Sequence, residues 1–107
     1  MISVEASDAF KGELKRLRKK YRSLDDDVDG LVSKLLLDPT FGQHLGNNCY
    51  KIRLNIRSKR AGAAGGARVI TYVILAGNRL VLLALYDKSE IASLSEKAIK
   101  SIIDSVK

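Results

Sequence analysis

Residue types that often mark a function are nearly missing from this chain of 107 residues, which has one cysteine, one histidine and one proline. Cys49 alone cannot form an intramolecular disulfide, which agrees with a reducing compartment. One histidine and one cysteine cannot supply the usual zinc ligands, and no Ser-His-Asp or Cys-His signature stands in a helpful context. The glycine-rich segment 62–66 lacks the G-K-[ST] ending of a phosphate-binding loop. We therefore expect no metal and no small-molecule cofactor.

Long hydrophobic runs are also missing. The longest, residues 80–85, is far shorter than the ~20 residues of a membrane span. The first ten residues carry Glu5 and Asp8 and lack the apolar stretch of a signal peptide, so we expect none. A single proline excludes a long proline-rich linker. With 46% hydrophobic residues in a chain of this length, the sequence predicts one globular, cytoplasmic domain.

The charge is strongly unbalanced, with a formal net charge of +7 and a pI of about 9.7. A basic surface favours polyanions, because neutralising phosphates releases their counterions. Nucleic acid is the partner that this charge favours. An anionic membrane surface, an acidic protein partner and plain solubility remain alternative explanations.

Hydrophobic periodicity predicts the order β-α-α-β-β-β-α, an α+β single domain with a twisted, mostly antiparallel sheet and helices packed on one side of it. We expect a short strand at residues 2–6, a helical hairpin at 8–38, a three-stranded sheet core within 49–86 and a C-terminal helix at 94–106. Residues 40–48 are predicted to form a polar loop and 58–67 a wide connection, and 77–78 a hairpin turn. Capping boxes are expected at 23–26 and 93–96.

Basic residues concentrate on the first strand of this core. Alternation places Lys51, Arg53 and Arg57 on one face of the strand and the apolar side chains on the other. Lys59, Arg60 and Arg68 follow, and no acidic residue falls between positions 51 and 68. Like charges along one strand face repel, which a fold tolerates more readily when a polyanion neutralises them. A plain solvated sheet face is the alternative interpretation.

The remaining candidates are aromatic and polar residues. Tyr21 and Tyr50 are expected in the core, whereas Tyr72 and Tyr86 can share the basic face and stack on an unpaired RNA base. Packing at the strand end is an equally good explanation of Tyr86. His44 is expected to be an exposed loop histidine, and Cys49 a small buried residue without a partner base.

Three motifs resemble the RelE/ParE toxin superfamily, and within it the RelE/HigB-like toxins: NCYKIRL at 48–54, GGARVITYV at 65–73 and YDKSEI at 86–91. The resemblance covers nearly the whole chain, so 1–107 is expected to be one RelE-like toxin domain. It implies a toxin of a type II toxin-antitoxin system, a ribosome-dependent mRNA endonuclease that inhibits translation. The implied partners are a cognate antitoxin protein, the ribosome and mRNA.

The same resemblance implies site residues. Lys51 and Arg53 match the paired basic positions of the strand motif, Arg68 a phosphate clamp, and Lys88 a residue that protonates the leaving oxygen. The tyrosine that some RelE toxins carry after the fourth strand has no direct counterpart here, since Leu94 stands near that position, and Tyr86 is the candidate substitute. Residues implied to bind ribosomal RNA are Arg57, Lys59 and Arg60.

Two further functions remain open at this point. A ParE-like toxin of the same fold would inhibit DNA gyrase by protein contact, although the Lys51/Arg53 pair and the YDKSE segment argue against it. A non-catalytic basic module that binds RNA or protein is the other alternative.

Overall fold

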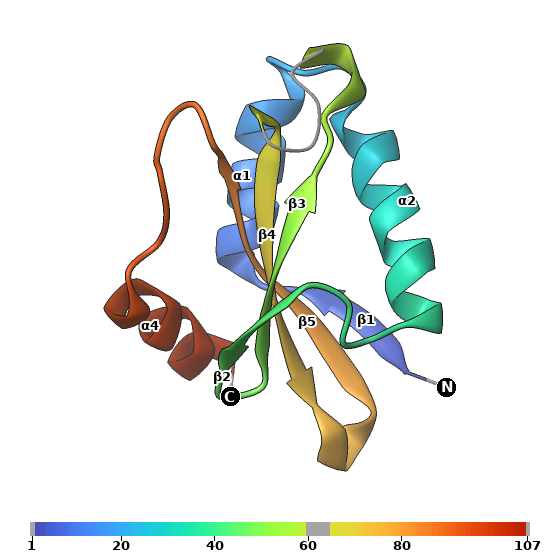
Figure 1. Ribbon diagram of the computed structural model, residues 1–107, viewed down its shortest axis with the longest axis vertical. Helices are drawn as coiled ribbons and strands as arrows, with labels where there is room; N and C mark the ends of the chain where they lie inside the picture. The colour runs from blue at the N-terminus through green and yellow to red at the C-terminus, as the bar shows by residue number, and fades with distance from the viewer. Residues whose placement is uncertain (1, 60–64, 107) are drawn as a thin grey trace.

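The computed structural model of this protein describes residues 2–59 and 65–106, which form one α+β fold (Figure 1). In the described part of the chain, a five-stranded sheet has the order β1-β5-β4-β3-β2. β1 runs parallel to β5, and the other neighbouring strands are antiparallel. The elements are β1 (Ser3–Ala6), α1 (Asp8–Arg18), α2 (Leu24–Leu37), β2 (Gln43–Gly46), β3 (Cys49–Leu54), β4 (Ala67–Ile74), β5 (Arg79–Asp87) and α4 (Glu96–Val106), with 3-10 turns η1 (Arg57–Lys59) and η2 (Leu75–Gly77).

The predicted α+β class and the order of the main elements are confirmed. β4 and β5 lie in the middle of the sheet and are buried along most of their length, a position that their apolar sequences favour. The turn between them passes through η2 and Asn78, which has a positive φ of 51°. Asparagine tolerates this left-handed conformation, which is why Gly-Asn indicated a turn here.

The predicted loop at 40–48 is wrong in part, because residues 43–46 form the edge strand β2. This strand pairs with β3 through a turn in which Asn47 and Asn48 both have positive φ, 52° and 62°. Two successive left-handed residues suit a two-residue hairpin, and Asn is among the few residue types that adopt them readily. In the sequence, the pair Asn47-Asn48 is therefore the feature that indicates this hairpin.

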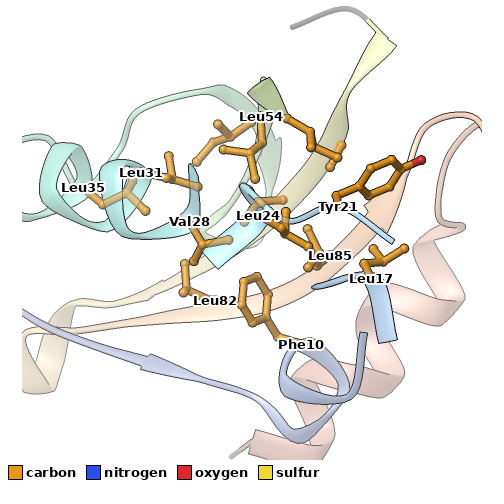
Figure 2. Close-up of a cluster of buried hydrophobic side chains, with 14 of the residues drawn as sticks. Phe10, Leu17, Tyr21, Leu24, Val28, Leu31, Leu35, Leu54, Leu82 and Leu85 are labelled. Carbon is orange, nitrogen blue, oxygen red and sulfur yellow. The ribbon is translucent and has the colours of Figure 1, made fainter. Parts of the chain in front are cut away.

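One face of the sheet packs against α1 and α2. Phe10 and Leu17 of α1 and Val28 and Leu31 of α2 are buried among side chains of β3, β4 and β5. Figure 2 shows Phe10 beside Val28 and Leu82, and Tyr21 at the rim with its hydroxyl directed away from the aliphatic side chains. The expected core positions of Tyr21 and Tyr50 are both found on this face, Tyr21 buried and Tyr50 half-buried.

The opposite face packs against α4, so the expectation that all helices lie on one side is wrong. Ile99, Ile102 and Ile103 of α4 contact a second cluster that includes Ile70 and Leu83. The reason lies in β4 and β5, whose side chains are apolar on both faces. Each face then needs a cover to keep these side chains from water. Figure 1 shows α4 on the other side of the sheet from α2.

The helix ends follow local chemistry, with two corrections. Ser7 caps α1, since its Oγ accepts a hydrogen bond of 3.0 Å from the backbone N–H of Phe10. The capping box expected at 23–26 is wrong, because the Ser23 hydroxyl instead donates to Asp27 at 2.7 Å. α4 is capped by Ser95 rather than from residue 93, with Ser95 Oγ accepting from the Ala98 N–H at 3.1 Å. None of the helices in the described part of the chain combines the length and hydropathy of a membrane span.

Candidate functional site

A row of polar side chains crosses three strands on the α4 face of the sheet. Strand register places Arg53 of β3 opposite Arg68 of β4, and Arg68 opposite Tyr86 of β5. Residues directly opposite in an antiparallel pair share a face and lie within ~5.5 Å at their Cα atoms. Lys51 lies two positions before Arg53 on β3, so it shares this face, as the alternation predicted. The register therefore brings these four candidate residues to one face of the sheet.

Three of these residues, Lys51, Arg53 and Arg68, border an open cleft of about 470 Å³ next to this row. The segment before and within β2 provides one wall, β3 and β4 the floor, and the residue after β5 the opposite side. The lining residues are Phe41, Gly42, Gln43, Lys51, Ile52, Arg53, Arg68 and Lys88. Four of these are basic, and no acidic side chain is among the described residues that line the cleft. Such a cleft attracts phosphate groups.

Gly42 shapes this cleft by allowing the chain to pass close to β3. Its φ is +113°, and a Cβ at this position would lie 2.7 Å from the Lys51 carbonyl oxygen and 2.8 Å from Cγ1 of Ile52. Only glycine combines this backbone conformation with so close an approach. The wall of the cleft therefore depends on a residue that sequence reasoning had assigned to a loop and had not singled out.

Arg68 and Lys88 are held by backbone carbonyl groups. Arg68 is 5% exposed, and its Nη1 donates to the Ala67 carbonyl oxygen at 3.1 Å. Lys88 Nζ donates to the carbonyl oxygen of Ala92 at 2.8 Å, within the segment that leads to α4. A guanidinium and an ammonium with fixed orientation bind phosphate at a smaller entropic cost than mobile side chains do.

Tyr86 is 4% exposed and stands at the junction of β5 and the space under α4. Burial raises the pKa of Tyr86, and the positive charge of Arg68 partly offsets this. The phenol therefore stays protonated at neutral pH, when it can donate a proton or a hydrogen bond. It does not line the cleft itself, which separates it from the other four predicted site residues.

Between the two site residues Tyr86 and Lys88 lies Asp87, which is fully buried on the opposite face of the sheet. Its carboxylate accepts hydrogen bonds from the Tyr21 hydroxyl at 2.6 Å, Lys59 Nζ at 2.8 Å and the Ser89 hydroxyl and N–H at 2.7 and 2.9 Å. Burial acts to raise the pKa of Asp87, but the hydrogen bonds from Lys59, Tyr21 and Ser89 outweigh it and hold the pKa well below its usual range. Sequence reasoning missed this residue.

The three residues predicted to bind RNA outside the cleft have different surroundings. Arg57 does not continue the basic face of β3, because the strand ends at Leu54 and Arg57 begins η1. It is 65% exposed and pairs with Asp27 through Nε at 2.8 Å. Lys59 is 15% exposed and bound to Asp87, which gives it a role within the fold. Arg60 lies outside the described residues.

Arg57 belongs to a second basic hollow, formed where α1 ends and α2 begins. The hollow has a volume of about 620 Å³ and is lined by Lys19, Lys20, Arg22, Ser23, Arg57 and Ser58. Its four basic residues come from two segments that are distant in the sequence. The helical-hairpin turn, which the sequence indicated only as a structural element, therefore contributes to the basic surface.

The other candidates lie apart from the basic cleft. The ring of His44 lies 5.0 Å from that of Tyr50, on exposed β2, and Tyr72 borders a separate hollow beside the C-terminal half of α4. Cys49 is buried, as expected, and burial raises the pKa of its thiol, which disfavours the reactive thiolate. Within residues 2–59 and 65–106, no group of three or more His, Cys, Asp or Glu side chains is placed to hold a metal ion.

Fold and cleft together define a class: a small α+β protein with a mixed sheet and a basic cleft on one face. Among solved structures, the chain is similar to the E. coli toxin RelE, in a double arginine-to-alanine mutant in the free state. The TM-score is 0.65, the match covers 99% of this chain and 98% of that chain, and the sequences are 14% identical. The fold is therefore RelE-like. No protein-family model matches this sequence.

Proposed function

We propose that this protein is a RelE/HigB-like toxin of the RelE/ParE superfamily, formed by residues 1–107, and that it is a ribosome-dependent mRNA endonuclease. The observation that carries the proposal is the cleft in which Lys51, Arg53, Arg68 and Lys88 converge with no acidic residue in its described lining. Such a site neutralises a phosphodiester and the additional charge that develops on it during cleavage.

The proposed reaction uses the RNA's own 2′-hydroxyl as the nucleophile. The 2′-oxygen forms a bond to the adjacent phosphorus while the bond from phosphorus to the 5′-oxygen breaks, giving a cyclic phosphate and a free 5′-hydroxyl. The amine of Lys51 takes the proton of the 2′-hydroxyl, and Lys88 gives a proton to the leaving 5′-oxygen. Arg53 and Arg68 hold the non-bridging oxygens, which carry the developing charge.

The remaining basic surface has a separate role in this proposal. The hollow around Arg57 binds the phosphate backbone of ribosomal RNA and orients the toxin on the ribosome. An acidic antitoxin segment is attracted to the same +7 chain and keeps it inactive in the cytoplasm.

Primer extension on mRNA programmed into purified ribosomes tests the activity. We expect cuts within the A-site codon with the wild-type protein, and a ~10²–10³-fold slower reaction with Lys51→Ala or Arg53→Ala, as for removal of one group that stabilises the transition state. Lys15→Ala removes the same charge from an exposed position of α1 outside the cleft and should leave the rate unchanged.

The result also separates the alternatives. Growth arrest with intact mRNA refutes the proposal, and a DNA-damage response in such cells indicates a gyrase inhibitor. Ribosome binding without cleavage, unchanged by Lys51→Ala or Arg68→Ala, indicates a non-catalytic binding module.

A further inference from the structure

A second pocket lies beneath α4, directly beside the basic cleft. It has a volume of about 240 Å³ between the helix and the α4 face of the sheet. Its apolar residues come from the strands, from the segment before α4 and from the helix: Leu45, Cys49, Ile70, Leu94, Ile99 and Ile103. Its polar residues are Asn47, Lys51, Tyr86, Glu96 and Lys100. A pocket that combines apolar side chains with several polar groups suits a flat organic ring whose edges form hydrogen bonds.

Two residues connect this pocket to the cleft. Lys51 lines both of them, and Tyr86 lines the pocket while its neighbour in register, Arg68, lines the cleft. Lys51 and Arg53 are two residues apart on β3, about 6.6 Å along the strand. A ligand with a phosphate at Arg53 and Arg68 can therefore place a group one nucleotide away under α4.

The pocket has the size of one base. An apolar cavity of ~150 Å³ admits a benzene ring, so 240 Å³ suits a single nucleobase and is too small for a base pair. Proteins that recognise single-stranded RNA commonly stack an unpaired base on an aromatic side chain and hydrogen-bond its edges. Tyr86 and the other polar residues of this pocket supply groups of these kinds. We infer that this pocket binds one unpaired base of the RNA whose phosphate lies in the cleft, an inference that rests on the proposed function.

Glu96 indicates which bases are preferred. It lies in the first turn of α4 at the pocket, and a carboxylate accepts hydrogen bonds but donates none. Adenine, cytosine and guanine carry an exocyclic amino group that can donate a hydrogen bond to a carboxylate, whereas uracil carries none. Lys100 supplies positive charge on the same pocket and offsets the repulsion between Glu96 and the RNA phosphates. Glu96 is thus assigned as a residue that determines base preference.

Binding of short RNAs tests the pocket independently of cleavage. The probes are trinucleotides with a 2′-deoxy sugar at the scissile position, which blocks the reaction, and with adenine, cytosine, guanine, uracil or no base at each position in turn. We expect removal of the base at one position to weaken binding about five- to 150-fold, the usual range for one bound base. At that position uracil should bind more weakly than the other three bases.

Variants of α4 provide matched controls. Ile99→Phe fills the pocket and should abolish the difference in affinity between RNAs with and without a base at that position. Ile102→Phe, on the same helix but lining a different hollow, should preserve this difference in affinity. Glu96→Gln should remove the discrimination against uracil, and Asp104→Asn, at the other end of the helix, should not. Thermal unfolding of each variant confirms that α4 remains packed.

The outcomes separate this inference from the proposed function. If the wild type cleaves RNA with equal rates and affinities for all bases at every position, the inference that the pocket binds a base is overturned and the proposed function stands. Base-dependent binding without any cleavage overturns the proposed function alone. Where trinucleotides bind too weakly to measure, codon series on the ribosome decide: a base preference that Glu96→Gln removes supports the pocket, and a uniform rate overturns it. If the protein neither binds nor cleaves RNA, both the pocket inference and the proposed function are overturned.

Discussion

Replacing Asp87 with alanine should cost more stability than any other single loss of charge in the described structure. The carboxylate is fully buried and accepts hydrogen bonds from Lys59, Tyr21 and Ser89. Its removal leaves the Lys59 ammonium, 15% exposed, without its partner. Breaking a buried ion pair in this way costs about 3–5 kcal/mol, a large part of the ~5–15 kcal/mol that holds a domain folded.

The assay is thermal and urea unfolding of the purified protein. At roughly 4 °C per kcal/mol for a domain of about 100 residues, Asp87→Ala should lower Tm by roughly 12–20 °C. Glu5→Ala is the matched control, because it changes the net charge equally but breaks an exposed pair with Arg79, and it should change Tm little. A Tm of Asp87→Ala within ~4 °C of the wild type would refute the reasoning.

A double-mutant cycle shows whether the ion pair itself is responsible. Lys59→Met removes the ammonium and keeps most of the side-chain volume, and Asp87→Asn removes the charge and keeps the shape. If the two groups stabilise the fold through each other, the double variant will be less destabilised than the sum of the single variants. Strict additivity would mean that Asp87 acts mainly through Tyr21 and Ser89.

Three further predictions concern the pH dependence of Asp87, two glycines and the cap of α1. Because the pKa of Asp87 is lower in the folded than in the unfolded state, where it is ~3.9, its contribution to stability is complete above about pH 5 and is lost progressively as the pH falls further. The urea midpoint of Asp87→Asn should therefore fall less steeply with acid than that of the wild type. Gly42→Ala should destabilise the fold and disturb the backbone at Lys51, visible as shifted amide resonances of β3, whereas Gly30→Ala, at an open site in α2, should stabilise by ~0.5–1 kcal/mol in urea unfolding. Ser7→Ala removes both the cap of α1 and a buried hydrogen bond to the Leu83 carbonyl oxygen, and should cost about 1–3 kcal/mol in the same assay.

The sequence predicted those parts of the fold whose signals are local. Ser7 is a residue type that favours the N-cap, and α1 begins directly after it. Asp38-Pro39 ends α2, because the residue before a proline is disfavoured in the helical conformation. The side on which α4 packs is not a local property. It depends on β4 and β5 being apolar on both faces, which the sequence shows, but a strand's own pattern does not say which helix covers which face.

The positions of the candidate site residues, too, were only partly predictable from the sequence. Alternation along β3 correctly placed Lys51 and Arg53 on one face, since every second residue of a strand shares a face. The same alternation failed for Arg57, because the strand ends before it and a 3-10 turn redirects the chain. Lys59 and Asp87 are 28 residues apart, and neither residue carries a sequence signal that links it to the other. Contacts of this kind depend on the three-dimensional path of the chain.

The end of β5 links stability to the proposed chemistry. Successive residues of a strand point to opposite faces, so Tyr86 and Lys88 lie toward α4 and the cleft while Asp87 points into the other side of the sheet. The four hydrogen bonds that Asp87 accepts fix the backbone between the two site residues. A conservative change at Asp87 should therefore alter the geometry of the cleft, although Asp87 does not line it. At a temperature where the variant is fully folded, Asp87→Asn should lower kcat for cleavage more than it weakens RNA binding. Unchanged kcat in the folded variant would mean that the carboxylate stabilises the fold and nothing more.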